Sequence, residues 1–222
     1  MRKQLLKLPK EPLASNEMSQ SPLGLSEDLI KRLLYLLGAL IVFRLGTHIV
    51  IPFISQTALA SLVEDNRDGI LGMFNMFSGG ALERLSIFTL GIMPYISSSI
   101  IMTLMTSVVP HFEQLKKEGE VGRRKITQYT RMGTLFLAVF QSYGISIALQ
   151  SQSGAGVALV TNPGLTFSFV TVVTMTTGTL FLMWLGEQIT EKGVGNGISM
   201  IIFAGIVAGL PVSLGNTLSM VG

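Results

Sequence analysis

The chain has 222 residues, of which 16 are Lys or Arg and 13 are Asp or Glu. Only 13% of the residues are therefore charged, whereas a soluble domain carries about 25%. Three long stretches contain no Asp, Glu, Lys or Arg: residues 85–112, 132–186 and 193–222. An apolar helix needs about 20 residues to cross roughly 30 Å of hydrocarbon. Composition therefore excludes an ordinary soluble domain and indicates an integral membrane protein, and the absence of cysteine excludes disulfides and thiolate chemistry.

The N-terminal part divides into a polar tail and a first span. Residues 1–30 are mixed in charge and are predicted to form a tail without a fold of its own. Residues 33–54 are predicted to be the first span, interrupted by Arg44 and ended near Pro52. A cleaved signal peptide is the alternative, since residues 58–60 resemble a cleavage site, but the polar region before the apolar stretch is too long for one.

The next segment, residues 69–82, is uncharged but has only 14 residues, too few to cross the membrane. Apolar side chains recur at i, i+3, i+4 and i+7 from Ile70 to Phe77, which places them on one face of a helix. A short re-entrant or interfacial helix is therefore predicted here, and Gly79 and Gly80 end it.

The rest of the chain is predicted to form the second to fifth spans, at residues 85–109, 132–149, 167–185 and 198–214. Pro94 is expected to kink the second span in the middle of the membrane. A basic loop at residues 111–131 leads to the third span. The predicted fold class is an all-α integral membrane protein with five transmembrane helices and a short re-entrant helix.

The basic residues predict the orientation of these spans. If the N-terminus is cytoplasmic, 13 of the 16 Lys and Arg residues fall on the cytoplasmic side, as the positive-inside rule requires. Outside lie only Arg67 and Arg84, and Arg44 is within a span, where it either contacts a partner helix or snorkels. The basic run at residues 123–125 either contacts anionic lipid, RNA or an acidic protein, or serves only to fix the topology.

The residue types needed for enzyme chemistry are scarce. His48 and His111 are the only histidines, and there is no H-E-x-x-H pair or carboxylate dyad. We therefore expect no enzymatic activity, no metal site and no cofactor. The glycine-rich residues 193–197 lack the spacing of a phosphate-binding loop and are predicted to be a tight turn that aims the last span.

Isoleucine pairs and hydroxyl groups stand out within the spans. Ile92 and Ile96 are spaced i, i+4 and share a helix face. The same spacing relates Ile198 and Ile202 in the last span. Taken alone, either pair fits a lipid-facing or core position. The second span also carries hydroxyls that either mark a polar path or bond back to helix carbonyls: Ser97, Ser98, Ser99, Thr103 and Thr106.

Longer runs of residues resemble one known family. Residues 75–82 and 91–97 resemble the plug and second span of the SecY family, the central subunit of the bacterial protein-conducting channel. Residues 117–131 resemble its first cytoplasmic loop, and residues 183–191 and 195–199 resemble its second. The runs follow the family's order. They match only the first half of its ten-span fold, which is built from two five-span halves of inverted topology.

This resemblance implies roles for particular residues. It implies that part of a hydrophobic pore ring is formed by Ile92, Ile96, Ile198 and Ile202. It implies a plug that includes Ile70, Met73, Phe74, Asn75, Met76, Phe77, Ser78, Gly79 and Gly80. It implies one side of a lateral gate at Pro94, Ser97, Ser98 and Thr103. Candidates for cytoplasmic contacts are Arg123, Arg124 and Lys125.

The function that the resemblance implies is translocation of unfolded preproteins across the bacterial cytoplasmic (inner) membrane and insertion of membrane proteins into it. The implied partners are small membrane subunits like SecE and SecG, preprotein signal sequences and membrane lipid. The motor ATPase SecA and the ribosome are expected to bind mainly through the family's second half, which this sequence does not match.

Two other interpretations remain open. The first is half of a secondary transporter, because such proteins also combine inverted repeats with broken helices. It requires a site for a coupling ion, and the scarcity of ionisable residues within the spans disfavours it. The second is a non-functional product of a split or truncated gene.

Overall fold

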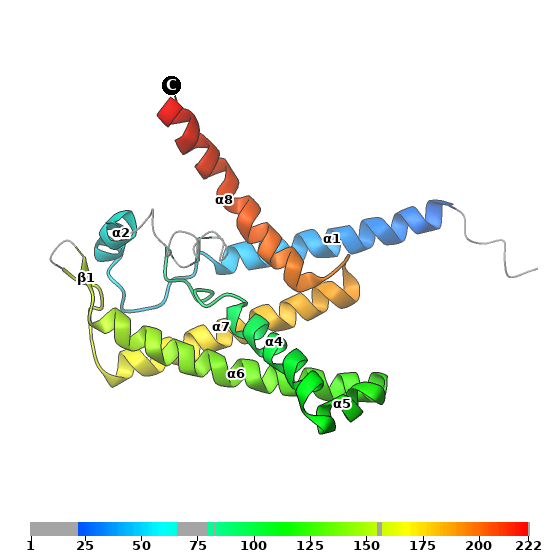
Figure 1. Ribbon diagram of the computed structural model, residues 1–222. Coiled ribbons are helices and arrows are strands. Elements are labelled where there is room, and N and C mark those ends of the chain that lie inside the picture. Colours follow the sequence, from blue (N-terminus) through cyan, green and yellow to red (C-terminus); the bar gives the residue numbers. More distant parts are fainter. Residues whose placement is uncertain (1–21, 66–79, 82, 155–156, 222) are drawn as a thin grey trace, which may run out of the picture.

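The computed structural model describes residues 22–65, 80–81, 83–154 and 157–221 (Figure 1). Its helices are α1 (Pro22–Gly46), α2 (Gln56–Asp65), α4 (Met93–Val108), α5 (Pro110–Lys117), α6 (Glu120–Gln150), α7 (Leu165–Lys192) and α8 (Gly197–Val221). Within the described ranges, the one sheet is a short antiparallel pair between α6 and α7, formed by β1 (Ser153–Gly154) and β2 (Val157–Ala158). The predicted all-α class is confirmed. The re-entrant helix predicted at residues 69–82 lies outside the described residues, except for 80–81.

Two of the described helices, α6 and α7, are long and apolar enough to cross a membrane. They contain the third and fourth predicted spans. A third crossing is reached if α4 and α5 are counted as one, although the pair is bent by 97° at the break between them. The apolar part of α8 that meets this description, Gly197–Gly209, is shorter. The chain is thus a multi-pass membrane protein, and the total of five spans stays a prediction.

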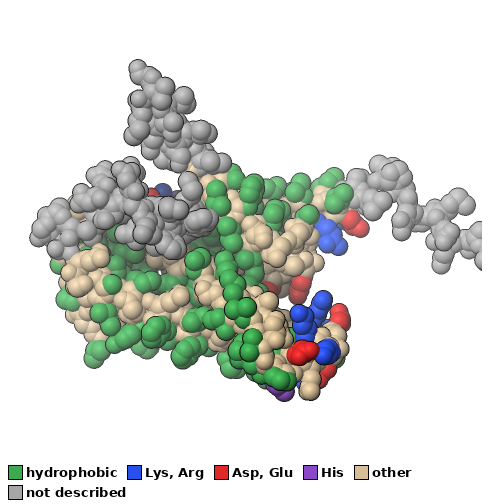
Figure 2. Space-filling view, viewed as in Figure 1, with side chains coloured by type: hydrophobic (Ala, Val, Ile, Leu, Met, Phe, Trp, Pro, Cys, Tyr) green, Lys and Arg blue, Asp and Glu red, His purple; other side chains and the backbone are tan. Residues whose placement is uncertain are grey.

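The surface has apolar sides and a charged end. On the face that Figure 2 shows, hydrophobic side chains are spread along the helices, and most of the visible Lys, Arg, Asp and Glu side chains gather around the corner between α5 and α6 and near the start of α1. On α6, Met132, Phe136 and Phe140 are 70%, 73% and 71% exposed. An apolar helix face of this kind suits hydrocarbon rather than water.

Helices α6 and α7 lie side by side and antiparallel (Figure 1). Three polar contacts across their interface keep one register: Arg131 with Glu187, Ser142 with Thr176, and Gln150 with Ser168. From one pair to the next, the residue number rises along α6 by as much as it falls along α7, as a constant antiparallel register requires. Five of the buried residues of α6 are small and recur at every fourth position: Thr130, Thr134, Ala138, Ser142 and Ser146. Small residues at this spacing let two helices approach closely.

The first and second predicted spans are wrong in extent, because each is only partly helical. α1 ends at Gly46 instead of continuing to residue 54, and α4 begins at Met93 instead of residue 85. The two non-helical segments pair with each other, because residues 49–51 and 85–87 exchange backbone hydrogen bonds of 3.0 and 2.9 Å. This pairing satisfies buried backbone groups outside a helix.

Three other features also differ from the prediction: the start of the first helix, the effect of Pro94 and the basic loop. α1 begins at Pro22, so residues 22–30 are helical rather than an unstructured tail; proline suits the first turn of a helix. Pro94 lies in the first turn of α4, where its missing N–H breaks no helical bond, and the predicted kink in mid-helix is wrong. The basic segment predicted as a loop at residues 111–131 is mostly helical, since α5 and α6 cover nearly all of it. The two helices are joined by a short turn in which Gly119 has a φ of 71°, a backbone conformation that favours glycine.

The non-helical segment before α4 is held between α1 and α7 by Phe88. Its ring stacks on Phe43 of α1 with centroids 6.0 Å apart, and on Phe181 of α7 with centroids 5.9 Å apart. A Cβ atom on Gly46 would meet the Phe88 ring, and one on Gly178 would meet the carbonyl oxygen of the residue before Phe88. The segment therefore fits only because both helices carry glycine where they face it.

We expect Gly178→Ala to lower the free energy of unfolding by about 1–3 kcal/mol, because the added methyl group overpacks a contact with backbone. Gly144→Ala is the matched control, since it is also helical and has nothing within 4 Å of its Cβ position. The control should be neutral or stabilising by up to about 1 kcal/mol. Denaturation in detergent micelles, followed by circular dichroism, measures both. Equal stability of the two variants would contradict the proposed tight fit.

Candidate pore-lining site

All four isoleucines of the predicted pore ring lie in one apolar cluster. Ile92 is buried, at 6% exposure, and the other three pack against the buried group while half-buried: Ile96, Ile198 and Ile202. The buried members come from α1, α7, α8 and the segment before α4: Leu36, Ala39, Phe43, Ala81, Phe88, Ile92, Leu182, Leu185, Ile189 and Ile201. The fold thus brings together two pairs that are far apart in the sequence.

Both isoleucine pairs stand at the start of a helix. Ile92 is the N-cap residue of α4, and its carbonyl accepts a 3.0 Å hydrogen bond from the amide of Ile96. Ile198 and Ile202 lie in the first two turns of α8. The i, i+4 spacing predicted from the sequence is therefore realised in both helices. α4 and α8 begin at the same cluster, so a shift of either helix start would change the packing of the isoleucines within it.

The end of the predicted plug segment touches this cluster. Most of the proposed plug residues, from Ile70 to Gly79, lie outside the described residues. Gly80 has a φ of 82°, and Ala81 is fully buried within the isoleucine cluster. The carbonyl of Ala81 accepts hydrogen bonds from the amide of Ser86 (2.9 Å) and the hydroxyl of Thr89 (3.3 Å). The chain leaving residues 69–79 is thus anchored at the cluster.

The predicted lateral-gate residues do not form one surface within this half. Pro94 is buried, and Ser98 donates a 2.8 Å hydrogen bond to the carbonyl of Thr130 on α6. Ser97 is half-buried, whereas Thr103 is exposed and donates to the carbonyl of Ser99 in its own helix at 2.8 Å. Of the two alternatives for the hydroxyls, bonding to backbone carbonyls is what Ser98 and Thr103 do.

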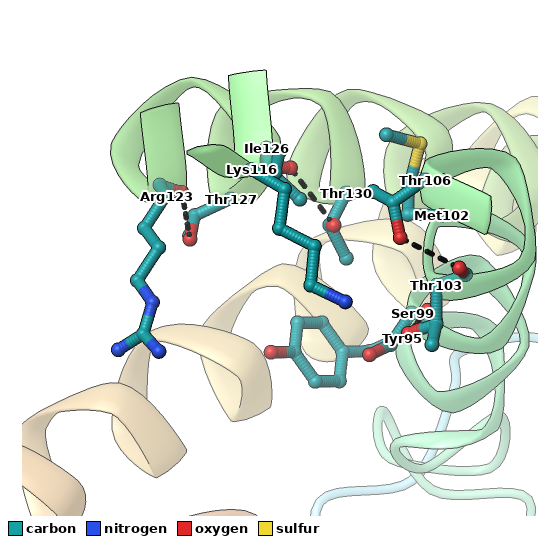
Figure 3. Close-up of a pocket in the computed structure, with 10 residues that line it drawn as sticks. All are labelled: Tyr95, Ser99, Met102, Thr103, Thr106, Lys116, Arg123, Ile126, Thr127 and Thr130. Carbon is teal, nitrogen blue, oxygen red and sulfur yellow. Dashed lines mark hydrogen bonds between the residues drawn. The ribbon is translucent and has the colours of Figure 1, made fainter. Parts of the chain in front are cut away.

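A pocket of about 270 Å³ lies near the charged end, between α4, α5 and α6 (Figure 3). It is lined by Tyr95, Ser99, Met102, Thr103, Thr106, Lys116, Arg123, Ile126, Thr127 and Thr130. In Figure 3 the Lys116 side chain reaches over Tyr95, and the Arg123 guanidinium extends away from the other labelled side chains. Arg124 and Lys125 are exposed outside the pocket, with Lys125 Nζ 3.9 Å from a carboxylate oxygen of Glu118. Of the three predicted cytoplasmic contact residues, which are all exposed, only Arg123 lines the pocket.

Two polar features near the site were missed by the sequence reasoning. Arg131 forms a two-pronged ion pair with Glu187, with Nε and Nη2 donating to the two carboxylate oxygens at 2.9 and 2.6 Å. Asn196 caps α8 by accepting hydrogen bonds from the amides of Ile198 (3.1 Å) and Ser199 (3.3 Å). The cap has a local signal, because asparagine is favoured just before a helix. The ion pair has none, since 56 residues separate its partners.

His48 lies on the surface, where its Nδ1 is 2.9 Å from the carbonyl of Arg44. No group of three His, Cys, Asp or Glu side chains gathers anywhere in the described ranges. At the charged end, the hydrogen bond from Lys117 lowers the pKa of the Glu113 carboxyl. The cluster itself offers close contact between apolar side chains, which suits a seal.

Long apolar helices, exposed apolar faces and a buried cluster at two helix starts define a multi-pass helical membrane protein. The SecY family model matches residues 86–221. The chain belongs to the SecY family.

Relatives in bacteria agree with this assignment. The protein translocase subunit SecY of Escherichia coli strain K12 is 58% identical over 209 residues, which cover 94% of this chain and 46% of that protein. The same subunit of Buchnera aphidicola from Acyrthosiphon kondoi is 59% identical over 209 residues, covering 94% of this chain and 58% of that protein. The Pseudomonas aeruginosa subunit is 61% identical over 194 residues, covering 87% and 42%. The chain spans about half the length of the curated relatives it matches.

Two solved structures share the fold. One is described as Sec61 in the canine ribosome–channel complex from the endoplasmic reticulum, and the other as the structure of a protein-conducting channel. Each has a TM-score of 0.54 at 15% sequence identity, covering 80% of this chain and 36% of that chain. The chain therefore shares the fold of part of these larger structures.

The Arg131–Glu187 pair should couple α6 to α7. The two side chains are 49% and 20% exposed, so solvent screens the pair and we expect a coupling of about 0.5–1 kcal/mol from a double-mutant cycle with Arg131→Gln and Glu187→Gln. Unfolding in detergent micelles provides the measurement. Glu113→Gln, which removes one partner of the solvent-exposed pair with Lys117, is the control and should leave stability unchanged. Additive effects of the two single variants would show that the pair does not couple the helices.

Proposed function

We propose that this chain is the N-terminal half of a protein-conducting channel. The observation that carries the proposal is that one apolar cluster gathers Ile92 and Ile96, at the start of α4, together with Ile198 and Ile202, in the first two turns of α8. In the proposed channel these side chains form part of a ring around the translocation path. A ring of bulky apolar groups offers no ligands to a hydrated ion and closes a pore by dewetting. The proposed activity is a movement of apolar groups, without bond chemistry.

The remaining assignments extend this proposal. Residues 69–80 act as a plug on the outer side of the ring, and α4 with α6 forms one side of a lateral gate. The N-terminus lies in the cytoplasm and the membrane is the bacterial cytoplasmic (inner) membrane, where preproteins cross and membrane proteins insert. The proposed partners are small subunits like SecE and SecG, signal sequences, lipid, and, mainly through the second half, SecA and the ribosome. The naming of the close relatives as translocase subunits supports these assignments.

The transporter alternative gains no support from the described spans. Between residues 132 and 186, α6 and α7 carry no Asp, Glu, Lys, Arg or His. Ionisable groups within the membrane are typical of ion-coupled transporters, and these two helices offer none in that stretch.

A chimera tests the proposed function directly. In the E. coli SecY protein, the segment aligned with this chain is replaced by this chain, and the chimera is expressed in cells depleted of their own SecY. We expect growth and export of a secreted preprotein, because 58% identity over 209 residues preserves the contacts between the halves. Accumulation of uncleaved preprotein, with the chimera present in the membrane at normal level, would argue against the proposed function.

The ring has its own test in the same chimera. Changing all four ring isoleucines to glycine should raise ion leakage from reconstituted vesicles, because the constriction loses its apolar groups. The control changes four exposed helical isoleucines to glycine, at a similar helix-propensity cost: Ile41, Ile100, Ile101 and Ile147. Vesicle conductance that is unchanged in the ring variant, or raised equally in the control, would contradict the ring assignment.

A further inference from the structure

The junction between α7 and α8 is bridged by a single hydroxyl group. Thr190, in the last turn of α7, donates a 2.9 Å hydrogen bond from Oγ1 to the carbonyl of Gly186 in its own helix. The same oxygen accepts a 2.8 Å hydrogen bond from the amide of Gly197, the first residue of α8. The first amides of a helix have no partner within the helix, so Thr190 supplies from α7 what α8 lacks. The amide it holds belongs to the residue immediately before Ile198.

The two helices also approach closely at this point. A Cβ atom on Gly197 would meet the carbonyl oxygen of Gly186, and one on Gly186 would lie 2.9 Å from Cγ1 of Ile198. The backbones therefore leave no room for another side chain between them, and Ile198 rests directly on α7. The hydrogen bond to the Gly197 amide and the contact of Ile198 with Gly186 lie within one helical turn of each other. The orientation of the Thr190 side chain and the position of Ile198 on α7 are therefore geometrically linked.

Other helical threonines show that this arrangement is unusual for the fold. Thr103, Thr127 and Thr134 each donate to the carbonyl four residues earlier in their own helix, at 2.8 to 3.0 Å. Those bonds satisfy the hydroxyl but connect nothing beyond one helix. The hydroxyl of Thr190 makes the same local bond and also accepts from the start of the next helix. A local role does not explain the second bond.

We propose that Thr190 is a positioning residue for Ile198, and this inference rests on the proposed function as a channel. Its hydroxyl fixes the amide of Gly197 and so sets the direction in which α8 leaves α7. Ile198 and Ile202 stand on the first two turns of α8, and a pivot at its start displaces both from the apolar cluster that also holds Ile92 and Ile96. Loss of the hydroxyl therefore loosens half of the apolar seal without removing any apolar group from it.

The experiment compares Thr190→Val with Thr190→Ser in the chimera. Valine keeps the size of threonine and removes the hydroxyl, whereas serine keeps the hydroxyl and removes a methyl group. The Thr190 side chain as a whole is exposed, so neither change disturbs the core. Thr127→Val is the matched control, since it removes an exposed hydroxyl that bonds only its own helix. Two readouts are taken: amide hydrogen exchange in the peptide that covers residues 197–200, and ion leakage from reconstituted vesicles.

For Thr190→Val we expect exchange of the Gly197 amide to be about fivefold faster, the factor that corresponds to one ordinary hydrogen bond. Leakage should rise by about the same factor, because the population of the displaced α8 rises with it. Thr190→Ser and Thr127→Val should match the unchanged chimera in both readouts. The proposal is overturned if exchange is unchanged in Thr190→Val, if leakage stays flat while exchange rises, or if serine fails to restore either.

This design separates the inference from the proposed function. The glycine variant of the four isoleucines reports on the ring whatever Thr190 does. If that variant does not leak, the assignment of the four isoleucines to a pore ring is wrong, and Thr190 then has no positioning role for a pore. Faster amide exchange in Thr190→Val would in that case still establish the hydrogen bond between α7 and α8. If that variant leaks and Thr190→Val does not, the ring holds and only the role of Thr190 fails.

Discussion

The close approach of one non-helical segment to two helices determines where the rest of the structure can lie. Residues 83–92 run between α1 and α7 with Phe88 at their centre, and they fit because Gly46 and Gly178 present no side chain there. This segment delivers the chain to Met93, where α4 begins. It therefore places Ile92 inside the apolar cluster and leaves Ile96 one turn further on. A continuous helix through these residues would carry the isoleucines along its own axis and away from α8.

Sequence patterns predicted the regular parts of the fold and failed at this segment for a physical reason. α6, α7 and α8 contain the third, fourth and fifth predicted spans, because a long uncharged stretch indicates a membrane helix whatever surrounds it. Residues 47–54 and 85–92 are just as apolar, and composition alone extends α1 and α4 through them. Their backbones instead pair with each other and with the connection after α6, where residues 53 and 55 bond to residues 159 and 161. Such pairing depends on segments far apart in the sequence, which periodicity cannot reveal.

The sequence predicted the individual residues of the candidate site but not how the fold brings them together. The i, i+4 spacing showed that each isoleucine pair shares a helix face, but not that α4 and α8 start at the same cluster. The hydroxyls of α4 were ambiguous in the sequence, and the position of Ser98 opposite Thr130 settled its role as a contact with α6. The cap that Asn196 forms at the start of α8 follows a local rule, because asparagine is favoured just before a helix. The hydrogen bond between Thr190 and the amide of Gly197 depends on the shape of the turn between α7 and α8, which the sequence does not give.

The distribution of contacts also limits which parts can move in the proposed channel. α6 and α7 are joined by small residues and by polar pairs at three levels, and a slide of one residue would break every pair at once. In the proposed channel these two helices therefore serve as the frame. Among the described residues, α4 is tied to this frame by the hydroxyl of Ser98, which donates to a backbone carbonyl of α6, and α8 by the hydroxyl of Thr190, which accepts from its first amide. Packed helices shift between discrete arrangements rather than deforming continuously. Fewer of these polar contacts must break to displace α4 or α8 than to separate α6 from α7. In the proposed channel, opening therefore moves α4 and α8, the two helices whose starts place the isoleucines.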